Sequence, residues 1–163
     1  MRDITVRDAA ADDVAELARL WFDGWQDGHA GVLPAELRRL RTLVSFHTRL
    51  TAGLGAARVA EMNGAIAGFV MLKGDELYQC YVAASARGSD VAPALMADAL
   101  AQLRAAGVAT AWLACAIGNA RAVRFYEKQG WRRVGVMTSQ LETPEGVFPL
   151  DVWRYEIDLL PPG

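Results

Sequence analysis

The residues best suited to chemistry form a short loop between a predicted strand and a predicted helix. Strand-like residues at 76–83 are followed by small and polar residues at 84–90, and a helical pattern begins at about Val91. The first amides of a helix have no partners within it, so small residues there let an anion such as a diphosphate approach the main chain. Arg87 adds a positive charge at the rim. The same stretch is also typical of an ordinary strand-to-helix turn.

A second stretch, residues 118–131, reads GNARAVRFYEKQGW and is predicted to be a short helix that Gly130 closes in a left-handed conformation. Arg87-x-x-Asp90-x-Ala92 together with this stretch resembles the two signatures of the GNAT N-acetyltransferase superfamily. Those signatures are Q/R-x-x-G-x-G/A and N-x-x-A-x-x-F-Y-x-x-x-G-F/W. The resemblance covers essentially the whole chain, residues 1–163, as a single domain.

The resemblance implies acyl transfer from acetyl-CoA to a primary amine of a small molecule or a peptide, without a metal. It implies a mixed α+β fold, with a mostly antiparallel seven-stranded sheet that is flanked by about four helices and splayed between strands 4 and 5. The pantetheine arm would enter that gap and use backbone groups of residues 81–83. The residues expected to bind the cofactor are Tyr81, Val82, Ala83, Arg87, Gly88, Ser89, Asp90, Val91, Ala92, Pro93, Asn119, Phe125, Tyr126 and Lys128.

Asp90 departs from the family pattern because it stands where the loop usually has glycine. A carboxylate about 4 Å from a phosphate costs about 1 kcal/mol in water and about 4 kcal/mol at an intermediate dielectric. Several charge-assisted N–H bonds of roughly 1.5–3 kcal/mol each oppose that cost. Aspartate also tolerates left-handed backbone angles and can cap a helix. We therefore expect weakened binding at most, and the alternative is a catalytically impaired CoA-binding or interaction module.

Two residues are candidates for moving protons. Glu76 lies 11 residues before Arg87, which resembles the offset of the catalytic glutamate in the histone-acetylating branch of the family, and it would deprotonate the amine. A solvated charge beside the Gly74-Asp75 turn is the alternative, with water as the base. By the same resemblance Tyr126 would protonate the departing thiolate, and a packed helix tyrosine is its alternative. Strand alternation predicts Glu76, Tyr78, Cys80 and Val82 on one face.

The acceptor site is expected to be walled by the first two helices and the final strand pair, with Trp25, Asp27 and His29 close together near the end of the first helix. Acidic groups beside aromatic faces suit a cationic amine. Tryptophans at helical spacing are also typical of a core, and aspartates of a solvated face.

Composition excludes several function classes. The chain has 53% hydrophobic and 22% charged residues and a net charge of −2, which gives no bulk basic field for nucleic acid. Its apolar runs are too short to cross a bilayer, and the sequence starts without an apolar signal segment. Cys80 and Cys115 each lie in an apolar stretch, which indicates buried reduced thiols in a cytoplasmic protein. The β-rich C-terminal part could pair across a homodimer.

Periodicity predicts the elements that position these residues. Asp12 is expected to cap a helix to about residue 26, and Pro34 to begin a second helix that carries Leu37, Leu40, Val44, His47 and Leu50 on one face. Asn63-Gly64 predicts a hairpin between strands 58–62 and 65–73. Further strands are expected at 4–7, 76–83 and 110–117, and a helix at 91–105. The last two strands are expected at 131–137 and 152–159, joined by a long polar connection.

Overall fold

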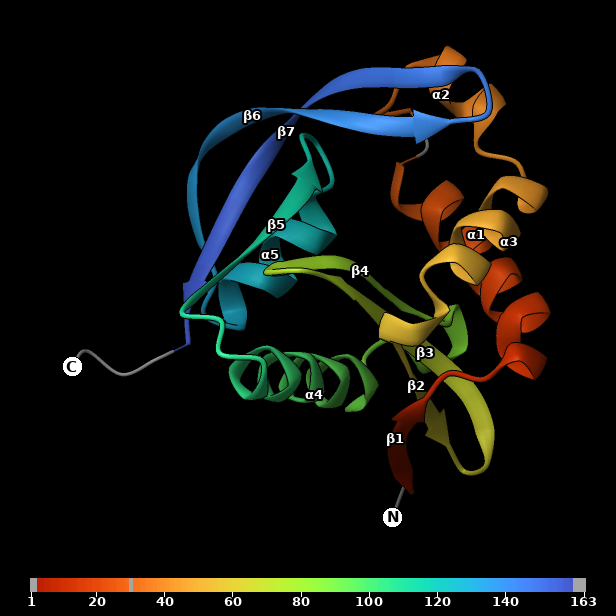
Figure 1. Cartoon of the computed structure of the whole chain (residues 1–163), viewed down its shortest axis with the longest axis vertical. Coiled ribbons are helices and arrows are strands. Elements are labelled where there is room, and N and C mark those ends of the chain that lie inside the picture. The colour runs from red at the N-terminus through yellow and green to blue at the C-terminus, as the bar shows by residue number, and fades with distance from the viewer. Residues whose placement is uncertain (1–2, 30, 160–163) are drawn as a thin grey trace.

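The computed structural model describes residues 3–29 and 31–159, so the predicted domain limits at residues 1 and 163 lie outside the described residues. Within these ranges seven strands form one sheet in the order β1-β2-β3-β4-β5-β7-β6 (Figure 1). The strands are β1 (Ile4–Asp8), β2 (Ala57–Met62), β3 (Ala65–Lys73), β4 (Glu76–Val82), β5 (Thr110–Ala116), β6 (Arg132–Thr143) and β7 (Gly146–Asp158). The α-helices are α1 (Val14–His29), α2 (Ala35–Leu40), α3 (Leu43–Ala52), α4 (Val91–Ala105) and α5 (Ala120–Lys128).

The sheet opens at the junction between β4 and β5. These two strands run parallel and pair only at Glu76 and Trp112, whereas every other neighbouring pair is antiparallel. Because β4 and β5 diverge from this single contact, the mixed fold with a splay between strands 4 and 5 is confirmed. The gap between them faces the site described below.

Helices cover both faces of the sheet (Figure 1), and one hydrophobic core lies on each face. On one face α4 contributes Leu95, Met96 and Leu103 to a core shared with β3, β5 and β7. On the other face α1 and α3 pack together, with Trp21 and Phe46 fully buried against β2 and β3. The walls of the gap are therefore held by packed elements on each side.

The predicted second helix is wrong in extent, because two helices, α2 and α3, replace it. Thr42 separates them, and its hydroxyl accepts the Ser45 N–H at 3.1 Å as an N-cap. The break also rotates the apolar face, so Val44 is 74% exposed instead of buried. The described residues therefore contain five α-helices, not about four.

The end of the sheet is a long hairpin, not two short strands with a polar connection. β6 and β7 pair from Arg132↔Glu156 to Thr143↔Gly146. Pro149 lies within β7, where a proline is tolerated because β5 pairs with β7 only from Val152 onward. The hairpin crosses over the sheet to α2 (Figure 1), and Arg39 of α2 forms an ion pair with Glu145 at 3.0 Å.

Three further predictions concern turns and helix ends. The predicted cap at Asp12 is wrong, because the carboxylate of Asp13 accepts the Ala10 N–H at 2.7 Å and a 3-10 helix (Ala11–Asp13) precedes α1. The hairpin at Asn63-Gly64 is confirmed, with φ of 55° and 85°. Gly130 ends α5 in the predicted left-handed conformation, with φ of 98°.

Candidate active site

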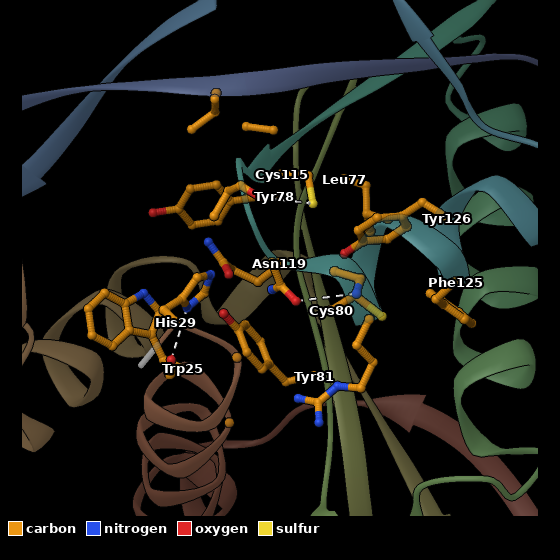
Figure 2. Close-up of a pocket in the computed structure, with 18 of the residues that line it drawn as sticks. Trp25, His29, Leu77, Tyr78, Cys80, Tyr81, Cys115, Asn119, Phe125 and Tyr126 are labelled. Carbon is orange, nitrogen blue, oxygen red and sulfur yellow. Dashed lines mark hydrogen bonds between the residues drawn. The ribbon is translucent and has the colours of Figure 1, made fainter. Parts of the chain in front are cut away.

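A cavity of about 370 Å³ lies where β4 and β5 diverge. The end of α1, the α2–α3 region, β4, β5, α5 and the β6–β7 hairpin all contribute to its wall. Figure 2 shows Trp25 and His29 on one side and Tyr126 on the other, with the Tyr126 hydroxyl directed toward the space between them. A cavity of this size suits a small ligand.

A bulge in β4 determines which side chains reach this cavity. The register against β3 shifts between Met71↔Gln79 and Leu72↔Leu77, which leaves Tyr78 as the extra residue. Leu77 and Cys80 then pack into the core under α4, whereas Tyr78 and Tyr81 pack toward α1 and α3. The prediction that Glu76, Tyr78, Cys80 and Val82 share one face is therefore wrong.

The backbone of β4 offers an open edge at Val82. The Ala83 N–H donates to the carbonyl of Ala67 at 2.7 Å, so that predicted contact is already used. Hydrogen bonds alternate along antiparallel strands, so the N–H and C=O of Val82 point away from β3 and toward the gap. Since β5 pairs with β4 only at Glu76, a ligand in the gap can pair with this edge.

The loop after β4 presents amides to the same end of the cavity. The amides of Arg87 and Ser89 donate to Ala84 and Ala86 carbonyls within the turn, and the Ser89 hydroxyl accepts the Val91 N–H at 3.3 Å. Among the described residues, the amides of Gly88, Asp90 and Ala92 have no acceptor. These amides lie in the loop and the first turn of α4, where unpartnered N–H groups favour an anion, and Gly88 and Ala92 also line the cavity.

Asp90 fits this loop without strain. Its φ of −83° is right-handed, and the left-handed position belongs to Gly88 with φ of 77°. The Asp90 side chain is exposed and makes no capping hydrogen bond, because Ser89 fills that role. The predicted capping by Asp90 is therefore wrong, and its carboxylate does not line the cavity.

Arg87 at the loop rim forms an ion pair with Asp27 of α1 at 2.7 Å. This contact lowers the pKa of Asp27. Arg87 lines the cavity and Asp27 does not. Asp27, which was expected at the acceptor site, therefore holds Arg87, which was expected to bind the cofactor.

Helix α5 places the second motif on the cavity wall. Asn119 caps it by accepting the Ala122 N–H at 3.3 Å, as the sequence predicts for a helix-opening asparagine. Tyr126 packs against Trp131 with ring centroids 6.4 Å apart and points its hydroxyl into the cavity (Figure 2). Burial raises the pKa of Tyr126 well above its ordinary value, and so do the neighbouring Cys80 and Cys115. The phenol therefore stays protonated at neutral pH.

Glu76 lies at the point where β4 and β5 meet and lines the cavity. Burial raises its pKa from the ordinary value of 4.5 to about 7, and the charge of Asp75 adds to the rise. Lys73 and Arg154 oppose this shift. A carboxylate with such a pKa can accept a proton at neutral pH.

The last turn of α1 supplies the other wall. Trp25 and His29 are both largely buried, and their rings lie 5.1 Å apart. The His29 Nδ1–H donates to the Trp25 carbonyl at 2.9 Å. Burial lowers the pKa of His29, so the imidazole is neutral near pH 7.

The structure brings most, but not all, of the predicted site residues together. Those lining the cavity are Trp25, His29, Glu76, Tyr81, Val82, Arg87, Gly88, Ala92, Asn119, Phe125 and Tyr126. Those outside its lining are Asp27, Ala83, Ser89, Asp90, Val91, Pro93 and Lys128. Lys128 is exposed on the last turn of α5.

Sequence reasoning missed three arginines in the wall, Arg41, Arg49 and Arg121. Arg41 follows the buried Leu37 by four residues and precedes the buried Ser45 by four, so its charge interrupts an otherwise uncharged buried face. That interruption was the available signal. The hairpin residues Ser139, Leu141 and Leu150 gave no signal, because the hairpin itself was not predicted.

Residues 12–131 match the model of the acetyltransferase (GNAT) family. The chain belongs to the GNAT acetyltransferase family. Members of this family are N-acetyltransferases that use acetyl-CoA as the acyl donor, so the expected enzyme class and cofactor follow from membership. No curated protein matches the sequence significantly.

Solved structures of GNAT proteins share the fold. A GCN5-related N-acetyltransferase from Rhodopseudomonas palustris is 20% identical, with a TM-score of 0.76 and 95% of each chain covered. PaiA N-acetyltransferase from Thermoplasma acidophilum, solved with coenzyme A, is 16% identical, with a TM-score of 0.70, 96% of this chain covered and 99% of that one. A ribosomal-protein-alanine N-acetyltransferase from Brucella melitensis is 20% identical, with a TM-score of 0.71, and 95% and 99% are covered.

Two features of other protein classes are absent from residues 3–29 and 31–159. No helix there is long and apolar enough to cross a membrane. No group of three or more histidine, cysteine, aspartate or glutamate residues there could hold a metal ion.

Proposed function

We propose that this GNAT enzyme moves an acetyl group from acetyl-CoA to a primary amine by direct attack, with Glu76 as base and Tyr126 as acid. The observation that carries the proposal is one cavity that combines an open strand edge, a loop of unpartnered amides and the Tyr126 hydroxyl. A carboxylate with a pKa of about 7 lies on the same wall.

The residues present fit acetyl-CoA, which supplies an acyl group already activated as a thioester. The amides of Gly88, Asp90 and Ala92 would hold its pyrophosphate. The open edge at Val82 would pair with its pantetheine arm. The ion pair with Asp27 holds the Arg87 side chain at the rim and offsets its charge, so the loop amides would supply most of the attraction for the pyrophosphate.

Glu76 would take the proton that an amine must lose before attack. A lysine-like amine has a pKa of about 10.4 and is charged at neutral pH. A base with a pKa near the working pH serves best, and burial places Glu76 there. Water at this position is the alternative base.

Tyr126 would give its proton to the departing thiolate. Its raised pKa keeps the proton in place until the thiolate forms. Burial also raises the pKa of Cys80 to about 12 and that of Cys115 to about 11. Because neither thiol ionises readily, neither suits a covalent acyl-enzyme, and this favours direct transfer.

The alternative, a CoA-binding module without activity, was suggested by Asp90. In the structure its side chain is exposed and absent from the cavity wall, so it does not cover the loop amides. This observation favours the enzyme over the impaired module.

Replacing Asp90 with glycine or asparagine is expected to tighten acetyl-CoA binding by roughly 5-fold, because each removes a solvated negative charge near the pyrophosphate. Calorimetric titration of acetyl-CoA measures the change. Asparagine keeps the backbone preferences and isolates the charge. Weaker binding by both variants would mean that Asp90 contributes to the site.

The proposed function is tested by release of free thiol from acetyl-CoA in the presence of amines. The panel consists of amino acids, polyamines, aminoglycosides and peptides with free N-termini. We expect release that depends on both protein and amine. Tight acetyl-CoA binding with no release for any amine would support the inactive module instead.

Three further expectations stay predictions. Two free cysteines indicate a cytoplasmic location. The exposed outer strand β6 could pair across a homodimer. A net charge of −2 argues against nucleic acid as a partner.

A further inference from the structure

Two arginines in the cavity wall, Arg41 and Arg49, lie close enough for their charges to interact. Arg41 is only 3% exposed, and its Nη1–H donates to the Glu142 carbonyl of the hairpin at 2.7 Å. Arg49 of α3 is half-buried and donates to the Tyr78 hydroxyl at 2.8 Å. Both line the cavity, on the side formed by α2, α3 and the hairpin.

Neither arginine is neutralised within the protein. No carboxylate of the described residues lies within 4 Å of Arg41 or Arg49. By contrast Arg7, Arg39 and Arg58 each pair with two carboxylates. Burial and the charge of Arg49 lower the pKa of Arg41 to about 10, which still leaves it protonated at pH 7. A buried cation beside a second cation is costly unless an anion joins them.

The surrounding side chains hold Arg41 and Arg49 in place and strengthen their interaction with an anion. Arg49 stacks over Trp21 at 4.4 Å from the ring centroid and lies 5.7 Å from that of Tyr78. Leu37, Leu141 and Leu150 line the adjoining wall. Charge-assisted hydrogen bonds are strong in such apolar surroundings, and a planar guanidinium matches a carboxylate.

We propose that the acceptor is a free amino acid or a close analogue, whose carboxylate binds Arg41 and Arg49 while its amine faces Glu76 and Tyr126. This inference rests on the proposed function, since it names the substrate class for the same site. The apolar wall between the charged ends accommodates the body of the molecule. The sequence-based expectation placed Asp27 here for a cationic amine, but Asp27 pairs with Arg87.

The test compares amines that differ only in the carboxylate. Thiol release is measured for the amino acids, for their carboxamides and for the corresponding decarboxylated amines. We expect kcat/KM for the best amino acid to exceed that of both neutral analogues by at least about 10-fold. Arg49→Gln is expected to raise KM for the amino acid by about 10- to 100-fold and to leave the neutral analogues nearly unchanged. Arg49→Lys, which keeps the charge, is expected to restore part of the preference.

Arg38→Gln is the matched control, because Arg38 is exposed on α2 and does not line the cavity. It should keep the wild-type preference. Thermal unfolding of each variant separates lost binding from lost folding, since Arg41 and Arg49 also contact the hairpin and Trp21. Equal changes for charged and neutral amines in Arg49→Gln would assign the arginines a structural role and overturn the proposal.

The other possible outcomes of the thiol-release assay also test the proposed substrate class. A preference for neutral amines, for peptide N-termini or for phosphoethanolamine over every amino acid would overturn the proposed class. If no amine supports release, the proposed function fails, and the carboxylate site is tested separately by calorimetry with N-acetyl amino acids and their amides. Binding of the acids alone, lost in Arg49→Gln, would support the site without turnover. No binding would overturn it.

Discussion

Replacing Tyr126 with phenylalanine is expected to lower kcat by about 100- to 10,000-fold, the usual contribution of a positioned acid. The phenol points into the cavity (Figure 2), and its raised pKa keeps it protonated. Without its proton the thiolate must leave as a free anion from a buried site. Steady-state thiol release at saturating acetyl-CoA measures the loss.

Phenylalanine keeps the ring that packs against Trp131, so acetyl-CoA affinity and thermal stability should change little. Tyr155→Phe is the matched control, because that hydroxyl donates to Glu127 at 2.8 Å and lies outside the cavity lining. It should lose about 1 kcal/mol of stability and keep its kcat. Turnover by Tyr126→Phe equal to that of the wild type would show that another group, or water, protonates the thiolate.

Replacing Glu76 with glutamine is expected to lower kcat/KM at pH 8 by about 100-fold or more. A base must be ionised, and the pKa of Glu76 is about 7. The wild-type kcat/KM should therefore rise as the pH increases through about 7 and then level off, until the amine itself titrates. Glu76→Gln should lack this rise in kcat/KM near pH 7, which is the step that the pH profile reports. A pH profile of both proteins measures the effect.

Two controls separate catalysis by Glu76 from a structural role. Asp75→Asn removes the neighbouring carboxylate that raises the pKa of Glu76, so it should move the step to lower pH and keep the activity. Folding raises the pKa of Glu76 from 4.5 to about 7. Ionisation of Glu76 therefore lowers the free energy of unfolding as the pH rises through that interval. Glu76→Gln should therefore be no less stable than the wild type at pH 8. An unchanged step at pH 7 in Glu76→Gln would point to water or another base.

The parts of the site that could be predicted from the sequence lie in contiguous motifs. The loop at 84–92 and the stretch 118–131 carry their function in local sequence, because a strand end, a capping residue and a left-handed glycine act within a few residues. Asn119 and Gly130 behave as local rules predict. The splay between β4 and β5 followed from the family resemblance and not from periodicity.

The acceptor side could not be predicted in the same way, because it depends on contacts between distant segments. The β6–β7 hairpin reaches α2, and only this approach places the Glu142 carbonyl on Arg41. The β4 bulge depends on pairing with β3, and it alone turns Tyr78 toward Arg49. Pro144 and Pro149 suggested a loop, but only Pro144 lies in a turn, and Pro149 pairs with Gln140 of β6.

The central claim is that acetyl-CoA binds at the loop after β4 and along the β4 edge. Titration of acetyl-CoA into ¹⁵N-labelled protein, followed through backbone amide shifts, tests it most directly. We predict the largest changes at Gly88, Asp90, Ala92 and Val82, complete at one ligand per chain, with little change at Val134 and Val136 on the exposed part of β6. Amide shifts that avoid the loop and β4, or no shifts at millimolar acetyl-CoA, would contradict the account.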